Sequence, residues 1–144
     1  LVSTLLLRLV SMSVPAVLFP AVLVSTIFVL AVFGLVLVVR ALKTQKVSGH
    51  KPDGYVKVYY GSRIMGQTSL VKSNRNPSWS QRFNYYSAMV GGSLTVRVYD
   101  KDVVFDDFLG SCTTKIERGT YSARCNLSKG GTLYFTYTTV SKQP

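Results

Sequence analysis

The acidic side chains of this chain are few, and their placement is the feature that most suggests chemistry. Only 6 of the 144 residues are Asp or Glu, against 17 Lys and Arg. Five of the six lie in two turn-like stretches, at Asp53 and at Asp100, Asp102, Asp106 and Asp107. Carboxylates crowded in this way repel one another unless a cation neutralises them, and calcium takes its oxygen ligands largely from carboxylates in flexible loops. The pattern favours a calcium site. The alternative is a solvated acidic loop with Asx turns or caps.

The tip of the second acidic stretch is apolar. Val103, Val104 and Phe105 stand between Asp102 and Asp106. Three apolar residues are out of place in a loop that only contacts water, and they suit a loop that enters a lipid interface. The alternative is that they fold back on the core.

Short strands are the elements that must position these loops. From Gly34 onward, short apolar runs recur between Gly, Pro, Asn and Ser clusters, and no helical period longer than two turns follows residue 43. Such punctuation is typical of an all-β sandwich or barrel. Eight strands are expected, over residues 35–42, 55–60, 67–71, 79–85, 94–99, 111–116, 121–127 and 133–137.

The chain opens on an apolar leader. Residues 11–39 contain no charged side chain, and a transmembrane helix needs about 20 residues. Residues 1–33 are therefore expected to form a helix that is a cleaved signal peptide or a transmembrane anchor, with a core helix as the alternative. Val32–Gly34 is a passable cleavage site, and Arg8 opposite Arg40 leaves the orientation of an anchor open. The expected location is secreted, extracellular or membrane-anchored.

Three motifs, in order, resemble the C2 domain family. Asp53–Val58 looks like the signature in which the family's first loop leads into a strand, and Asn76–Trp79 like its Asn-Pro-x-Trp turn. Val98–Asp102 followed by Asp106–Gly110 looks like its third calcium loop. The likeness is greatest to the C-terminal C2 domains of perforins and fish perforin-like proteins, which share the stretches Leu109–Cys112 and Arg124–Leu127. We expect a C2 domain over residues 34–140 and a tail over 141–144.

The resemblance implies an eight-stranded antiparallel sandwich whose loops hold calcium at one end and dock onto phospholipid. The carboxylates that match the family's calcium ligands are Asp53, Asp100, Asp102, Asp106 and Asp107. Residues that match Val103 and Phe105 are apolar or aromatic in perforins and enter the membrane.

The first loop departs from the family pattern. Val47 stands where the family usually has another Asp, and Lys46 and Lys51 add positive charge. Fewer carboxylates and nearby cations weaken calcium binding. We expect a weak or reduced site of one ion, and complete loss of binding is the limiting case.

Cys112 and Cys125 are the only cysteines, and they fall on consecutive expected strands. An even pair behind a secretory-looking leader favours one disulfide, and the perforin resemblance supports this pairing. Two reduced core thiols are the alternative. Asn126-Leu127-Ser128 forms a glycosylation sequon whose exposure the sequence leaves open.

The remaining charge points to an anionic partner. Residues 40–144 carry 16 basic and 6 acidic groups, a net charge of +10, which attracts anionic phospholipid membranes. No nucleic-acid motif is visible and no small-molecule substrate is expected. His50 reads as an ordinary loop residue without a nucleophile nearby, so no enzyme is expected. The predicted function is calcium-assisted binding of phospholipid membranes. The alternative is a calcium-independent module that uses its basic surface for anionic membranes or a protein partner.

Overall fold

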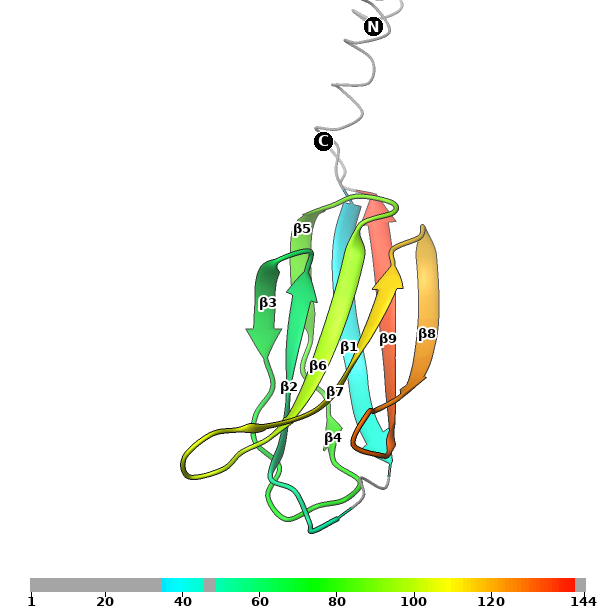
Figure 1. Ribbon diagram of the computed structural model, residues 1–144. Coiled ribbons are helices and arrows are strands. Elements are labelled where there is room, and N and C mark those ends of the chain that lie inside the picture. Colours follow the sequence, from blue (N-terminus) through cyan, green and yellow to red (C-terminus); the bar gives the residue numbers. More distant parts are fainter. Residues whose placement is uncertain (1–34, 46–48, 142–144) are drawn as a thin grey trace, which may run out of the picture. The chain divides into compact units, whose positions relative to one another are not determined.

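The computed structural model describes residues 35–45 and 49–141, which form nine β-strands in two antiparallel sheets (Figure 1). In chain order the strands are β1 (Leu35–Gln45), β2 (Gly54–Tyr60), β3 (Arg63–Gln67), β4 (Ser78–Trp79), β5 (Phe83–Ala88), β6 (Ser93–Asp100), β7 (Asp107–Lys115), β8 (Gly119–Asn126) and β9 (Thr132–Ser141). The prediction of an all-β antiparallel sandwich is confirmed.

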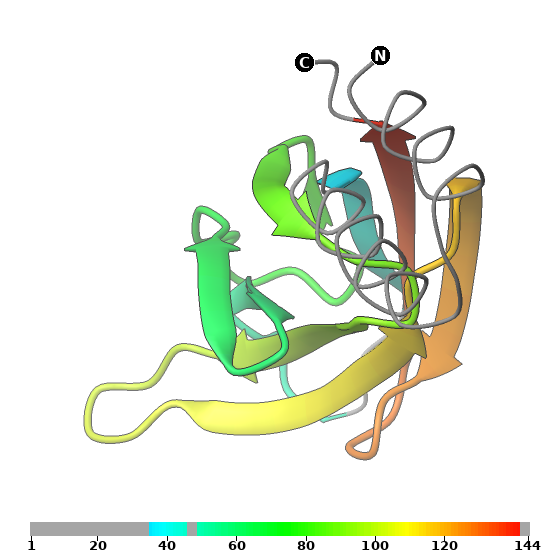
Figure 2. The same ribbon diagram turned by 90° about the horizontal axis from the view of Figure 1, so that it is seen from above.

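Each of the two sheets has its own spatial order of strands. In the first sheet the order is β4-β1-β9-β8, and β5 also pairs with β1. In the second sheet the order is β3-β2-β6-β7. Figure 2 looks along the strands and shows the two sheets as separate layers. β1 and β6 belong to different sheets, and both strands finish at the same end of the sandwich (Figure 1).

The core follows the alternation seen in the sequence. Leu94, Val96 and Val98 of β6 are buried, as are Leu133 and Phe135 of β9. Successive side chains of a strand point to opposite faces, so one face of each sheet is apolar and packs against the other sheet. This packing holds the strand ends, and with them the loops, in fixed positions.

Two of the expected strands are placed differently in the structure. The strand expected over residues 67–71 is wrong: β3 spans Arg63–Gln67, because a tight turn at Gly61 (φ 57°) returns the chain at once from β2. The strand expected over residues 79–85 is divided into β4 and β5, because residues 80–82 have no partner in β1, which is irregular between Arg40 and Lys43. The expected eight strands are consequently nine.

A disulfide joins the edges of the two sheets. Cys112 of β7 is bonded to Cys125 of β8, with Cα atoms 6.0 Å apart. The predicted pairing is confirmed. The expected leader helix of residues 1–33 and the tail from residue 142 lie outside the described residues. Within the part of the chain that the structure describes, no helix is long and apolar enough to cross a membrane.

Candidate functional site

Three segments meet at one end of the sandwich, which we call the loop end: residues 49–53 of the β1–β2 connection, the β6–β7 loop and the β8–β9 turn (Figure 1). Backbone hydrogen bonds tie them together. Lys101 N donates to Asp53 O at 2.8 Å, and Lys129 N donates to Leu109 O at 3.0 Å. A hollow of about 250 Å³ lies among them, with His50, Asp100, Asp107 and Lys129 in its wall. All five loop carboxylates belong to this end.

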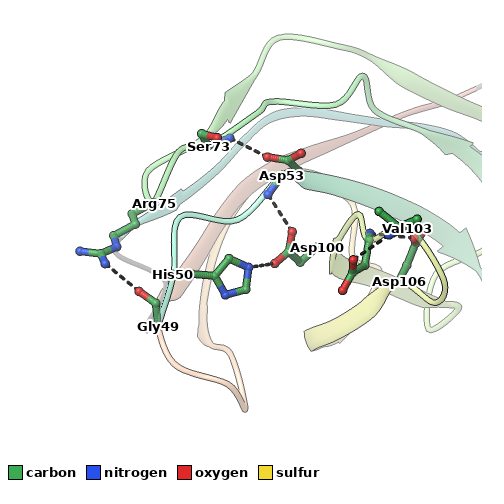
Figure 3. Close-up of polar contacts among 9 residues, drawn as sticks. Gly49, His50, Asp53, Ser73, Arg75, Asp100, Val103 and Asp106 are labelled. Carbon is green, nitrogen blue, oxygen red and sulfur yellow. Dashed lines mark hydrogen bonds and ion pairs between the residues drawn. The ribbon is translucent and has the colours of Figure 1, made fainter.

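Asp100 is the buried carboxylate of the loop end, with 5% of its surface exposed. Its Oδ1 accepts a hydrogen bond from Asp53 N at 2.7 Å, and its Oδ2 lies 2.8 Å from His50 Nε2. The carboxylate of Asp53 points elsewhere, since its Oδ1 accepts from Ser73 N at 2.8 Å. Figure 3 shows the two carboxylates directed toward these different partners. Asp100 therefore organises the β1–β2 connection.

Asp106 is held by a second set of partners across the loop end. Its Oδ2 accepts from the Tyr55 hydroxyl at 2.5 Å, its Oδ1 lies 3.1 Å from Lys101 Nζ, and Asp102 N donates to the same Oδ1 at 3.2 Å. The hydrogen bond from Tyr55 holds the pKa of Asp106 below its ordinary value, with Lys101 contributing. Burial, followed by Asp106 itself, raises the pKa of Tyr55 far above its ordinary value. Asp106 is ionised and locally neutralised by Lys101.

Asp102 and Asp107 complete the acidic set from exposed positions. Asp102 Oδ1 accepts from Val103 N at 2.7 Å, which shapes the start of the loop tip, and Asp107 is the register partner of Asp100 at the beginning of β7. Among residues 35–45 and 49–141, no three His, Cys, Asp or Glu side chains converge closely enough to hold one metal ion.

The donor set still fits calcium in its chemistry, because carboxylate oxygens on loops are the ligands that this ion takes. In the arrangement described here, Asp53, Asp100, Asp102 and Asp106 each face a partner within the protein. A shared ion would require some of these carboxylates to turn. Val47 and Lys46, which the sequence singled out as weakening the site, lie outside the described residues.

The loop tip is fully presented to solvent. Val103, Val104 and Phe105 are 98%, 77% and 83% exposed, and the β6–β7 loop stands away from the sandwich in both views (Figures 1 and 2). The alternative in which these residues fold back on the core is wrong. Three consecutive exposed apolar side chains form a surface suited to an apolar environment such as a lipid interface.

Three residues of the site were missed by sequence reasoning. His50 was expected to be an ordinary loop residue, yet it contacts the buried carboxylate of Asp100. Tyr55 and Lys101 were assigned to a strand and a loop without a role, and both bind Asp106. Of these three residues, only Lys101 could have been linked to the acidic loop from the sequence, because it lies between two Asp residues. The contacts of His50 and Tyr55 join residues that are far apart in the sequence, and no local sequence pattern predicts them.

Comparison with protein-family models matches residues 35–132 to the C2 domain. The chain belongs to the C2 domain family. This C2 domain is 38% identical to human perforin-1 over 81 residues, which is 54% of this chain and 14% of perforin-1. It is also 38% identical over 78 residues to an Arabidopsis thaliana protein named calcium-dependent lipid-binding protein, covering 52% of this chain and 15% of the relative.

Solved structures agree with the sequence comparison. A structure titled as that of a C2 domain superposes with a TM-score of 0.71 at 38% identity, and the match covers 73% of this chain and 97% of that one. This C2 domain corresponds to a small part of the curated relatives, which are several times longer. C2 domains often bind calcium or phospholipid membranes.

Proposed function

We propose that this C2 domain binds anionic phospholipid membranes through its loop end, with Val103, Val104 and Phe105 entering the bilayer and calcium strengthening the attachment. The observation that carries the proposal is the exposure of all three tip residues, from 77% to 98%, on a loop that stands out from the sandwich. Transfer of an exposed Phe side chain from water to an apolar phase contributes about 1.5–3 kcal/mol.

The net positive charge of the domain also favours an anionic membrane as its partner. The net charge of residues 40–144 is +10, from 16 basic and 6 acidic groups. Cations near an anionic leaflet contribute about 1 kcal/mol each and lose much of that at high salt. Lys51, Lys101 and Lys129 belong to the loop end itself. The loop end therefore carries basic residues beside the tip that is proposed to insert.

Calcium would be held by Asp53, Asp100, Asp102, Asp106 and Asp107, all of which belong to the loop end. When bound, the ion would supply positive charge that attracts lipid phosphates. The chain's own residues set the conditions for binding. His50 must leave Asp100, and Tyr55 and Lys101 must release Asp106, before these carboxylates can serve an ion. That competition is consistent with a weak site.

A second candidate is membrane or protein binding without calcium. It is favoured by the partners that the protein places on its own acidic groups: the ammonium group of Lys101 lies 3.1 Å from Asp106, and the imidazole of His50 lies 2.8 Å from Asp100. With these partners in place the loop end is partly neutralised from within. The basic surface would then carry the attraction.

Co-sedimentation with vesicles separates the candidates. Residues 34–144 are mixed with phosphatidylcholine vesicles, with and without phosphatidylserine, in calcium or chelator, at low and physiological salt. Binding that requires calcium would support the calcium-assisted mechanism. Binding in chelator that fades with salt would support the second candidate with a membrane partner. Absence of binding in every condition would contradict membrane docking and leave a protein partner. We also propose that this protein is secreted or membrane-anchored, which antibody detection of the full chain in medium and membrane fractions would test.

A further inference from the structure

We infer that Asn126 is an acceptor for an N-linked glycan, and that the glycan marks the side of the loop end that stays in water. Asn126-Leu127-Ser128 has the Asn-x-Ser pattern with a residue other than proline in the middle. The other Asn-x-Ser triplet of the chain, Asn76-Pro77-Ser78, is blocked by its proline. The modification is an addition to the C2 domain, and only its effect on docking rests on the function proposed above.

The structure presents Asn126 at an accessible place. It is the last residue of β8, an edge strand of its sheet, and its side chain is exposed. Its Oδ1 accepts a hydrogen bond from Thr132 Oγ1 at 3.2 Å. Among residues 35–45 and 49–141, none accepts a hydrogen bond from its Nδ2. The amide nitrogen that would carry a sugar is thus the atom not used by the fold.

The surroundings of Asn126 accommodate a sugar. Alternate residues of a strand share a face, and the face that Asn126 shares with β9 carries polar pairs: Thr120 with Thr138 at 2.9 Å and Ser122 with Thr136 at 3.4 Å. This face is hydrophilic and lies away from the core. A glycan at its end displaces no packed side chain.

The hydroxyl of Ser128, the third residue of the sequon, indicates when the sugar must be transferred to Asn126. In the folded domain Ser128 Oγ donates to Leu109 O at 3.3 Å, and Leu127 is buried. An enzyme that reads the Ser128 hydroxyl must therefore meet the chain before the β8–β9 turn packs against β7. The disulfide between Cys112 and Cys125, directly before Asn126, is of the kind that forms in the oxidising secretory compartment.

The transfer is redox-neutral and needs one co-reactant, a lipid-diphosphate-linked oligosaccharide. Nδ2 of Asn126 forms a bond to C1 of the first sugar while the bond from C1 to the diphosphate oxygen breaks. The lipid diphosphate leaves with that electron pair, and Nδ2 gives one proton to solvent. The product is a bulky, solubilising group on the protein surface.

The position of Asn126 gives the glycan a consequence for docking. The β8–β9 turn belongs to the loop end, because Lys129 N bonds to Leu109 O beside Asp107. Figures 1 and 2 place this turn and the β6–β7 loop on different sides of that end. A sugar does not enter hydrocarbon, so the β8–β9 side stays in water and the bilayer meets the β6–β7 side.

The test produces the full 144-residue chain in animal cells behind an added secretion signal. Wild-type protein is expected to lose mass on treatment with a peptide N-glycosidase, which converts a glycosylated Asn126 to Asp that peptide mass spectrometry locates. Asn126→Gln and Ser128→Ala should lack the glycan, Ser128→Thr should keep it, and the exposed control Asn84→Gln should keep it. If Asn126→Gln fails to fold, the wild-type peptide and Ser128→Ala decide the result. Secreted wild-type protein with unmodified Asn126 would overturn the inference.

Vesicle binding tests the orientation separately. Glycosylated and enzymatically deglycosylated protein should bind anionic vesicles equally, because the glycan lies outside the contact. A large gain on deglycosylation would show that the sugar stands within the contact and that the orientation is wrong. If neither form binds, the proposed membrane function fails while the glycan assignment is unaffected.

Discussion

His50 Nε2 lies 2.8 Å from Asp100 Oδ2, so the connection after β1 is fastened to the last residue of β6. This contact links the segment that precedes β2 to the end of the neighbouring strand β6, and the same carboxylate accepts a hydrogen bond from Asp53 N. A polar group as buried as Asp100 is costly unless it is hydrogen-bonded. The pair therefore supports the shape of the loop end and also stands in the way of a cation at Asp100.

Replacing Asp100 with Asn tests the metal role of this carboxylate. The amide removes the charge that would attract calcium, so calcium-dependent binding to anionic vesicles should be lost, whereas any binding seen in chelator should remain. Isothermal titration with calcium and co-sedimentation measure the two effects. The matched control is Glu117→Gln, which removes the one acid outside the loop end. An Asp100→Asn protein that responds to calcium like wild type would exclude Asp100 from the ligand set.

Replacing Phe105 with Ser tests membrane insertion. The side chain is 83% exposed, so its removal should leave the free energy of unfolding nearly unchanged. If the ring enters the bilayer, vesicle affinity should fall by about tenfold or more, because burial of a Phe contributes about 1.5–3 kcal/mol. Co-sedimentation and thermal melting are the measurements. Tyr86→Ser, at an exposed aromatic of β5, is the control; equal losses in both variants would argue against tip insertion.

Replacing Tyr55 with Phe tests the network around Asp106. The hydroxyl of Tyr55 is the largest cause of the lowered pKa of Asp106, so this pKa should rise toward its ordinary value. A lowered carboxyl pKa stabilises the fold above the unfolded value of about 3.9, and the contribution disappears as the pH falls through the lowered value. The acid limb of the unfolding curve should therefore become shallower in the variant. Carboxyl NMR titration follows Asp106 directly, and Tyr59→Phe should leave it unchanged.

Removing the disulfide tests how much the link between β7 and β8 contributes. Cys112 and Cys125 are 13 residues apart in sequence, and closing a loop of about this length stabilises a fold by about 3 kcal/mol in the chain-entropy model. The double variant Cys112→Ser/Cys125→Ser should lose about that much free energy of unfolding in urea. Reductant should lower the stability of the wild type similarly and leave the variant unaffected. Equal stability of the two proteins would show that the bond contributes nothing.

The fold was largely predictable because its signals are local. Alternation at Leu94, Val96 and Val98, and glycines at the turns, determine strands and their inward faces without knowledge of distant contacts. The misplaced strand over residues 67–71 shows the limit of such signals. Arg63–Gln67 has little strand character of its own and pairs with β2 because the turn at Gly61 places it there.

The candidate site was predictable in composition but not in contacts. The exposed tip and the gathering of the Asp residues at one end follow from motifs on neighbouring strands. The partners of the carboxylates do not. Tyr55 and Asp106 are 51 residues apart in sequence, and His50 contacts Asp100, which lies far from it in the sequence. Such pairings depend on loop paths that no periodic pattern encodes.

The central position of β1 in its sheet has a consequence for the order of folding during synthesis. Leu35 of β1 pairs with Ser141 of β9, near the end of the chain, whereas all strands of the β3-β2-β6-β7 sheet lie between residues 54 and 115. Pairings between distant segments form slowly. The sheet that bears Asp100 and the apolar tip can therefore assemble while the ribosome is still extending the chain. One edge of β1 can pair with β5, which ends at Ala88, but the other edge must wait for β9. During that interval the unpaired edge of β1 is the part of the nascent domain that chaperones would need to protect.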